Sequence, residues 1–202
     1  MKIGVIVDGK AEPEALLRLR GKLHGSGPFL KPLYVDLQPM APPSLVAKRA
    51  QRNINTLRAR GAQRIVLLID REERQDCAPE LAARIAEALG RRGECGITVV
   101  VKDRAFENWL VADPGCLAAL RARFRPTKAF MRRVSPNKAD NVRDAESLLS
   151  QIAVGPSYHK RHDPLKILGA MNVEAAAKNS RSFRRFLRVV GDTRYRNQSK
   201  RP

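Results

Sequence analysis

Three short apolar runs that end at acidic residues constrain the fold of this chain more than any other feature. The runs are IGVIV (3–7), RIVLLID (64–70) and ITVVVKD (97–103), with acids at or just after their ends at Asp8, Asp70 and Asp103. Uninterrupted apolar runs of this length are typical of strands buried on both faces of a sheet. Because helical patterns separate them, we predict an α/β fold with a parallel or mixed sheet covered by helices.

Apolar periodicity also divides the chain into regions. We expect a short strand at 32–38 and helices at about 12–23, 45–60 and 79–89, the second ending at Gly61 as a left-handed cap. Shorter helices are predicted at about 116–124, 143–153, 163–169, 173–178 and 181–190. The sequence therefore predicts an α/β core over 1–113, a helical basic extension packed on it over 114–191, and a flexible basic tail over 192–202.

The charge balance points to a polyanionic partner. The chain has 39 Lys and Arg residues against 20 Asp and Glu, a net charge of +19, and the basic residues concentrate in its second half. We predict a nucleic-acid surface there, against the alternative of a merely solvated basic face. Its candidate residues are Arg132, Arg133, Lys160, Arg181, Arg184, Arg185 and Arg188.

Carboxylates that gather in so basic a chain need an explanation. Asp8 and Glu12 follow the first run, Asp70 and Glu72 the second, and Glu107 lies just beyond the third. Ligands bind in the crevice at the carboxyl ends of strands in open α/β sheets, and Mg²⁺ prefers oxygen ligands. We expect these acids to hold Mg²⁺ or Mn²⁺. Ordinary turn chemistry, helix-start acids and a salt-bridged loop remain the alternatives.

A family resemblance rests on three segments in order. VDGKAEPEAL (7–16), LLIDREE (67–73) and FENWLVAD (106–113) resemble the motifs of Toprim-like nucleases, which read V-E-G-x-T-E, D-x-D and E-x-W-L-x-x-D. The chain looks most similar to the small Toprim-like proteins related to the OLD-family and RloB-type nucleases. The resemblance implies a Toprim-like sheet and metal-dependent cleavage of DNA or RNA, in anti-phage defence or repair.

The same resemblance implies roles for individual residues. Asp8, Glu12 and Glu107 would be catalytic and also metal-binding, Asp70 and Glu72 would hold the metal, and Lys138 would face the scissile phosphate ahead of Lys10 and Lys102. The family's first glutamate is Asp8 here, and the second acid of D-x-D is Glu72. Both changes alter the reach of a ligand, so a nucleic-acid-binding protein with an inactive site is the alternative.

Several functions are disfavoured. The sequence contains no P-loop and no GxGxxG, so an ATPase would have to be a separate partner. The three cysteines form no CxxC pair and no apolar run approaches a membrane span, which predicts a cytoplasmic protein with free thiols and no membrane contact. A basic structural protein associated with RNA is a further alternative, and it predicts no response to metal.

Overall fold

The structure is a computed structural model that describes residues 1–197. Its sheet contains the strands β1 (Ile3–Val7), β2 (Leu33–Tyr34), β3 (Arg64–Asp70) and β4 (Ile97–Lys102), in the order β2-β1-β3-β4. All three strand pairs are parallel. The sheet therefore presents the carboxyl ends of all its strands at one edge.

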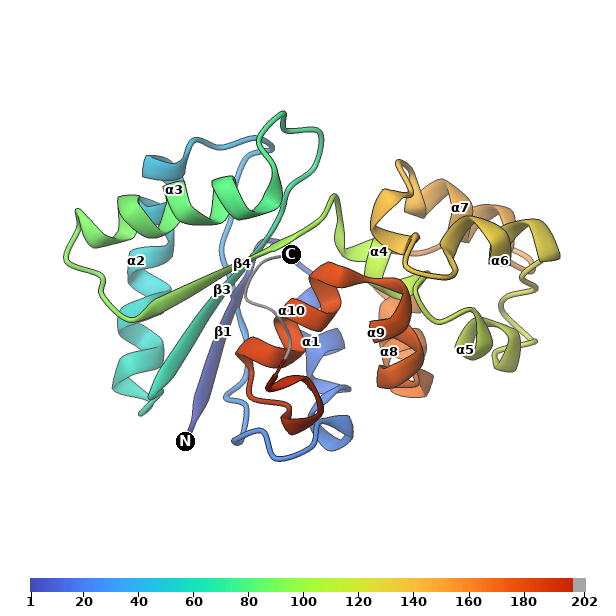
Figure 1. Cartoon of the computed structure of the whole chain (residues 1–202), viewed down its shortest axis with the longest axis horizontal. Coiled ribbons are helices and arrows are strands. Elements are labelled where there is room, and N and C mark those ends of the chain that lie inside the picture. Colours follow the sequence, from blue (N-terminus) through green and yellow to red (C-terminus); the bar gives the residue numbers. More distant parts are fainter. Residues whose placement is uncertain (198–202) are drawn as a thin grey trace.

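Helices cover both faces of the sheet (Figure 1). The helices α2 (Pro43–Ala59) and α3 (Ala78–Gly90) lie on one face, and α1 (Glu12–Leu17) and α10 (Arg181–Val189) lie on the other. Each face of the sheet has its own hydrophobic core, and alternate strand residues belong to one or the other. Val5 packs toward α1 and α10, and Ile6 packs toward α2. Gly61 ends α2 with a φ of +82°, as the sequence predicts.

The remaining helices follow β4. They are α4 (Phe106–Leu110), α5 (Pro114–Ala119), α6 (Lys128–Val134), α7 (Ala145–Gln151), α8 (Asp163–Ala170) and α9 (Val173–Asn179). Short 3-10 helices, η1 (Arg20–Lys22), η2 (Ala139–Asn141) and η3 (Thr193–Tyr195), complete the fold. Helices α5, α6 and α7 form a lobe beyond the carboxyl ends of the strands (Figure 1). Among residues 1–197, none of the helices has the length and apolar character that crossing a membrane requires.

The expected α/β fold, with a sheet covered by helices and a basic helical extension, is confirmed. The extension shares one core with the sheet, because Trp109 of α4 packs against Phe183 and Phe186 of α10 at ring-centroid distances of 5.1 and 5.2 Å. The first residues of the expected flexible tail are ordered instead. They form η3, and Asp192 is buried and accepts hydrogen bonds from Arg194. The rest of that tail, 198–202, lies outside the described residues.

Candidate active site at the carboxyl edge of the sheet

Three of the predicted acids meet at this edge. Asp8 follows β1, Asp70 ends β3, and Glu12 begins α1 after the turn at 8–11. One oxygen from each carboxylate lies within 4.8 Å of the other two. The backbone N–H of Asp70 also donates to Asp8 Oδ2 at 2.8 Å, which ties the two strand ends together. The parallel arrangement of β1 and β3 therefore brings together acids that are 62 residues apart in sequence.

The ammonium of Lys102 lies among these carboxylates. Its Nζ donates to Glu12 Oε1 at 2.6 Å and to Asp8 Oδ1 at 3.0 Å, and lies 2.9 Å from Asp70 Oδ1. The side chain of Lys102 has no exposed surface, and its Nζ stands 5.4 Å from the centre of the Phe106 ring. Lys102 thus supplies an internal counter-ion that no other described residue provides at these three acids.

Burial and mutual repulsion shift the titration of this cluster. Burial raises the pKa of Asp70 from its ordinary value to about 8, the charge of Lys102 opposes that rise, and Asp8 adds to it. Burial likewise raises the pKa of Glu12 well above its usual range. Burial acts to lower the pKa of Lys102, but the three carboxylates outweigh it and raise that pKa. The lysine therefore stays charged while Glu12 and Asp70 retain protons at unusually high pH.

The donor set fits a divalent cation in chemistry and in charge. Three ionised carboxylates and one ammonium leave a net charge of −2 in a buried site, which either two protons or one divalent ion would neutralise. Glu12 Oε2 is buried without a hydrogen-bond partner and is available as a ligand. Asp8, Glu12 and Asp70 are hard oxygen donors of the kind that Mg²⁺ and Mn²⁺ take. Any such ion must share these carboxylates with Lys102.

Glu107 stands beside the cluster. It lies in the first turn of α4, and its charge contributes to the raised pKa of Asp70. Tyr158 donates from its hydroxyl to Glu107 Oε1 at 3.3 Å. Lys160 forms an ion pair of 2.7 Å with Glu146, and its pKa is raised mainly by Glu146 and further by Glu107 and Asp70. A loop of the helical extension therefore borders the carboxylates.

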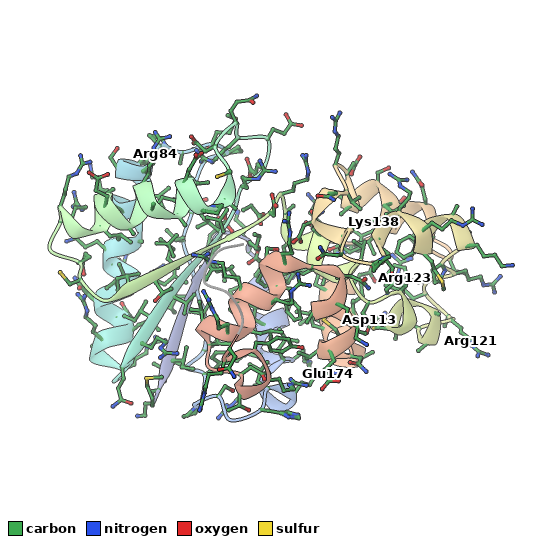
Figure 2. All side chains as sticks on the ribbon, viewed as in Figure 1. Arg84, Asp113, Arg121, Arg123, Lys138 and Glu174 are labelled. Carbon is green, nitrogen blue, oxygen red and sulfur yellow. The ribbon has the colours of Figure 1, made fainter. Side chains whose placement is uncertain are left out.

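Other predicted residues lie elsewhere. Glu72 adopts a φ of +55°, its N–H donates to the Arg104 carbonyl at 2.8 Å, and among residues 1–197 it is not part of the carboxylate group. The neighbouring Arg71 pairs with Asp103 at 2.7 Å, so this loop is salt-bridged in part. Lys138 is exposed among the helices that follow β4 (Figure 2), and Lys102, which sequence reasoning ranked below it, is the lysine at the acids.

The predicted basic residues fall into separate groups. Arg132, Arg133 and Lys138 line one pocket, while Arg185 and Arg188 line another with Arg64. On α10, Phe183 and Phe186 are buried in the core, and Arg181 is exposed. Arg184 donates to the Ala177 carbonyl and, at 3.0 Å, to Asn137 Oδ1, so this guanidinium also has a structural role.

Sequence reasoning missed the contribution of Tyr158 and underrated Lys102. A lysine that ends an otherwise apolar buried strand is a usable signal, because it must find counter-charges inside the protein. Tyr158 carried no comparable signal, since its partner Glu107 is 51 residues away.

Comparison with known proteins gives one match. The family model described as a domain of unknown function, DUF4276, matches residues 19–190. That range includes Asp70, Lys102 and Glu107 and begins after Asp8 and Glu12. No curated protein and no solved structure matches the chain. Because the matched range covers most of the chain, the protein belongs to the DUF4276 family of domains of unknown function.

Proposed function

We propose that this protein is a nuclease that hydrolyses phosphodiester bonds of DNA or RNA with Mg²⁺ or Mn²⁺. The observation that supports this most directly is the convergence of Asp8, Glu12 and Asp70 around a single ammonium, so that the site carries a charge of −2 once all three acids are ionised. A buried site with this excess charge and an unpartnered oxygen on Glu12 favours a divalent cation. The sheet edge on which it lies is also where open α/β folds bind substrates.

Within this proposal each residue has a distinct task. Asp8, Glu12 and Asp70 would hold the ion, with Glu107 at the border of the site oriented by Tyr158. The ion, when bound, activates water and stabilises charge on the phosphoryl oxygens. Lys102 keeps Asp8 and Glu12 in place through two hydrogen bonds and limits their repulsion.

A nucleic-acid substrate is supported by charge. The net charge of +19 favours a polyanion, and Lys160, in a loop of the helical extension, lies near enough to Glu107 and Asp70 for their charges to raise its pKa. We further propose a cytoplasmic protein, in keeping with its three free thiols, that acts in anti-phage defence or repair with any ATPase supplied by a separate partner.

One specific observation favours a second candidate function. Lys102 already sits among the three carboxylates, where it could substitute for a metal. In that case the protein would bind nucleic acid through an inactive Toprim-like site. Binding would be salt-sensitive, because released counter-ions drive it, and would not depend on metal.

A cleavage assay separates the two. Labelled DNA and RNA are incubated with the parent, with D8N/D70N and with E87Q, which removes one acid from an exposed pair with Arg91 on α3. The nuclease proposal expects metal-dependent cleavage by the parent and by E87Q, and a loss of about 100-fold or more in D8N/D70N. Equal cleavage by D8N/D70N would indicate a contaminant. Binding without cleavage under any metal would favour the inactive site.

A further inference from the structure

An open basic pocket lies in the helical extension between α6 and η2. Its volume is about 410 Å³, and it is lined by Arg132, Arg133, Lys138, Asn141, Val142 and Arg143. Four of these lining residues are basic, and no acidic residue lines the space. The pocket is separate from the carboxylate site at the sheet edge.

The charge of this pocket is not neutralised from within. Over residues 1–197, no hydrogen bond or ion pair engages the side chains of its four cations. The two acids nearest in sequence are used elsewhere. Asp140 is buried and accepts from the hydroxyls of Ser180 at 2.7 Å and Ser182 at 3.0 Å, while Asp144 caps α7 by accepting from the Ser147 N–H at 2.8 Å. The pocket therefore carries about four unneutralised positive charges.

The pocket is held in a fixed position relative to the sheet edge. The Asn108 side chain is buried and donates to the carbonyls of Ala139 at 2.8 Å and Val142 at 2.9 Å. Asn108 follows Glu107 in α4, so the segment that forms the pocket is fastened to the helix that borders the carboxylates. A ligand held in the pocket would be positioned with respect to the proposed active site.

Helix stabilisation explains only part of this cluster. Arg132 and Arg133 lie in the last turn of α6, where cations favour the helix dipole. That effect does not require Lys138 or Arg143, which follow the helix and line the same space. Four basic residues around one space without an acidic partner favour an anionic ligand.

We propose that this pocket binds a phosphate monoester, the group at the phosphorylated end of a nucleic-acid strand or on a free nucleotide. A phosphate monoester carries roughly −1.5 to −2 at neutral pH, whereas an internal phosphodiester carries a single charge. Guanidinium groups bind such oxygens in pairs of hydrogen bonds, and a volume of about 410 Å³ admits a nucleotide as well as its phosphate. That the phosphate belongs to DNA or RNA rests on the proposed function. If both hold, the enzyme would prefer strands with a phosphorylated end.

Equilibrium binding in EDTA tests this without any cleavage. The probes are a 3′-fluorescein 12-nucleotide single strand with a 5′-phosphate and the same strand with a 5′-hydroxyl, in DNA and in RNA, and a strand phosphorylated at its 3′ end. Competition by a nucleoside 5′-monophosphate and by inorganic phosphate separates a free nucleotide from a strand end. The variants are R133Q/K138Q and, as a control with the same loss of charge, K48Q/R52Q in a second pocket on α2.

The parent and K48Q/R52Q should prefer a phosphorylated strand by about 10-fold at about 0.1 M salt, as expected for charge-assisted hydrogen bonds. R133Q/K138Q should lose that preference while it still binds the hydroxyl strand. If the nucleoside 5′-monophosphate competes with a dissociation constant equal to that of the phosphorylated strand, the site would be assigned to free nucleotides. Equal binding of phosphorylated and hydroxyl strands by the parent, or an unchanged preference in R133Q/K138Q, would overturn the inference. Because no metal is present, these outcomes are independent of whether the protein cleaves nucleic acid.

Discussion

Lys102 is the cross-strand partner of Asp70 in the register of β3 and β4, and its Nζ lies 2.9 Å from Asp70 Oδ1. Neighbouring residues in register on parallel strands project to the same side of a sheet. The pairing of β3 with β4 is therefore enough to bring Lys102 and Asp70 together, without a contribution from any loop. Asp8 and Glu12, from the other side of β3, complete the group. The site is thus built on the rigid part of the fold.

Replacing Lys102 by Met should destabilise the protein strongly. The variant leaves three buried carboxylates without their counter-ion, and breaking a buried pair costs about 3–5 kcal/mol. The free energy of unfolding near pH 7.5 should fall by that amount, and the loss should shrink toward pH 5, because keeping Glu12 and Asp70 protonated in the folded state costs less free energy at lower pH. The control is K31M, which removes an exposed pair with Glu14 and should cost less than about 1 kcal/mol. Equal losses in the two variants would contradict the buried cluster.

The raised pKa of Asp70 predicts a pH dependence with a definite sign. The folded state binds the Asp70 proton up to a pKa of about 8, whereas the unfolded chain releases it near the ordinary value of 3.8. Between these values the folded state holds more protons, so stability falls as pH rises from about 4 to about 8. D70N cannot titrate and should flatten this part of the curve and exceed the parent at pH 8. Denaturant unfolding of both proteins in EDTA across this range is the measurement.

Divalent metal should raise the melting temperature by binding only the folded site. The rise with millimolar Mg²⁺ or Mn²⁺ should be larger at pH 8 than at pH 5, because protons and metal compete for Glu12 and Asp70. D70N should lose most of the response, while E87Q, altered at an exposed pair on α3, should keep it. If neither metal changes the melting temperature of the parent at any pH, the acids would form a structural cluster bridged by Lys102 and would not bind metal.

The sequence predicts part of the fold and of the candidate site, and individual residues show which part. The strands and the meeting of Asp8 with Asp70 were predictable, since buried apolar runs imply a parallel sheet whose strand ends share an edge. The family resemblance favours Lys138 over Lys102, whereas the strand order places β4 beside β3 and so brings Lys102 to the acids. Glu72 was expected with Asp70, but its backbone is left-handed, with a φ of +55°, and among residues 1–197 it is not one of the acids that come together.

The buried Asp140 should stabilise the junction between the sheet and the helical extension. Its carboxylate accepts from the Ser182 N–H at 2.9 Å and from the Ser180 and Ser182 hydroxyls, and Ser182 in turn accepts from Trp109 Nε1 at 2.7 Å. D140A leaves several buried donors unpaired and should cost about 2–4 kcal/mol. D144A removes an exposed helix cap and should cost about 1 kcal/mol. Thermal and urea unfolding would compare them, and equal losses would contradict the network.

Gly9 should be required for the position of Glu12. A Cβ at residue 9 would lie 2.8 Å from Glu12 Cδ and overlap the carboxylate that Lys102 holds. Gly9 has no positive φ, so alanine is compatible with its backbone and the effect arises from the methyl group alone. In G9A we expect the Glu12 carboxylate to move, the metal-dependent rise in melting temperature to fall by half or more, and any metal-dependent cleavage to fall about 10-fold or more.

The matched control for Gly9 is G21A in η1, where a Cβ would meet nothing within 4 Å. It should leave both the metal response and any cleavage at parental levels. If G9A instead kept the parental metal response, Glu12 would not be a ligand, and the ion would have to bind through Asp8 and Asp70 without it. Comparison with E12Q distinguishes these cases, because that variant keeps the shape of the side chain and removes its charge. G9A and E12Q should therefore show the same loss if the methyl group acts only by displacing the carboxylate.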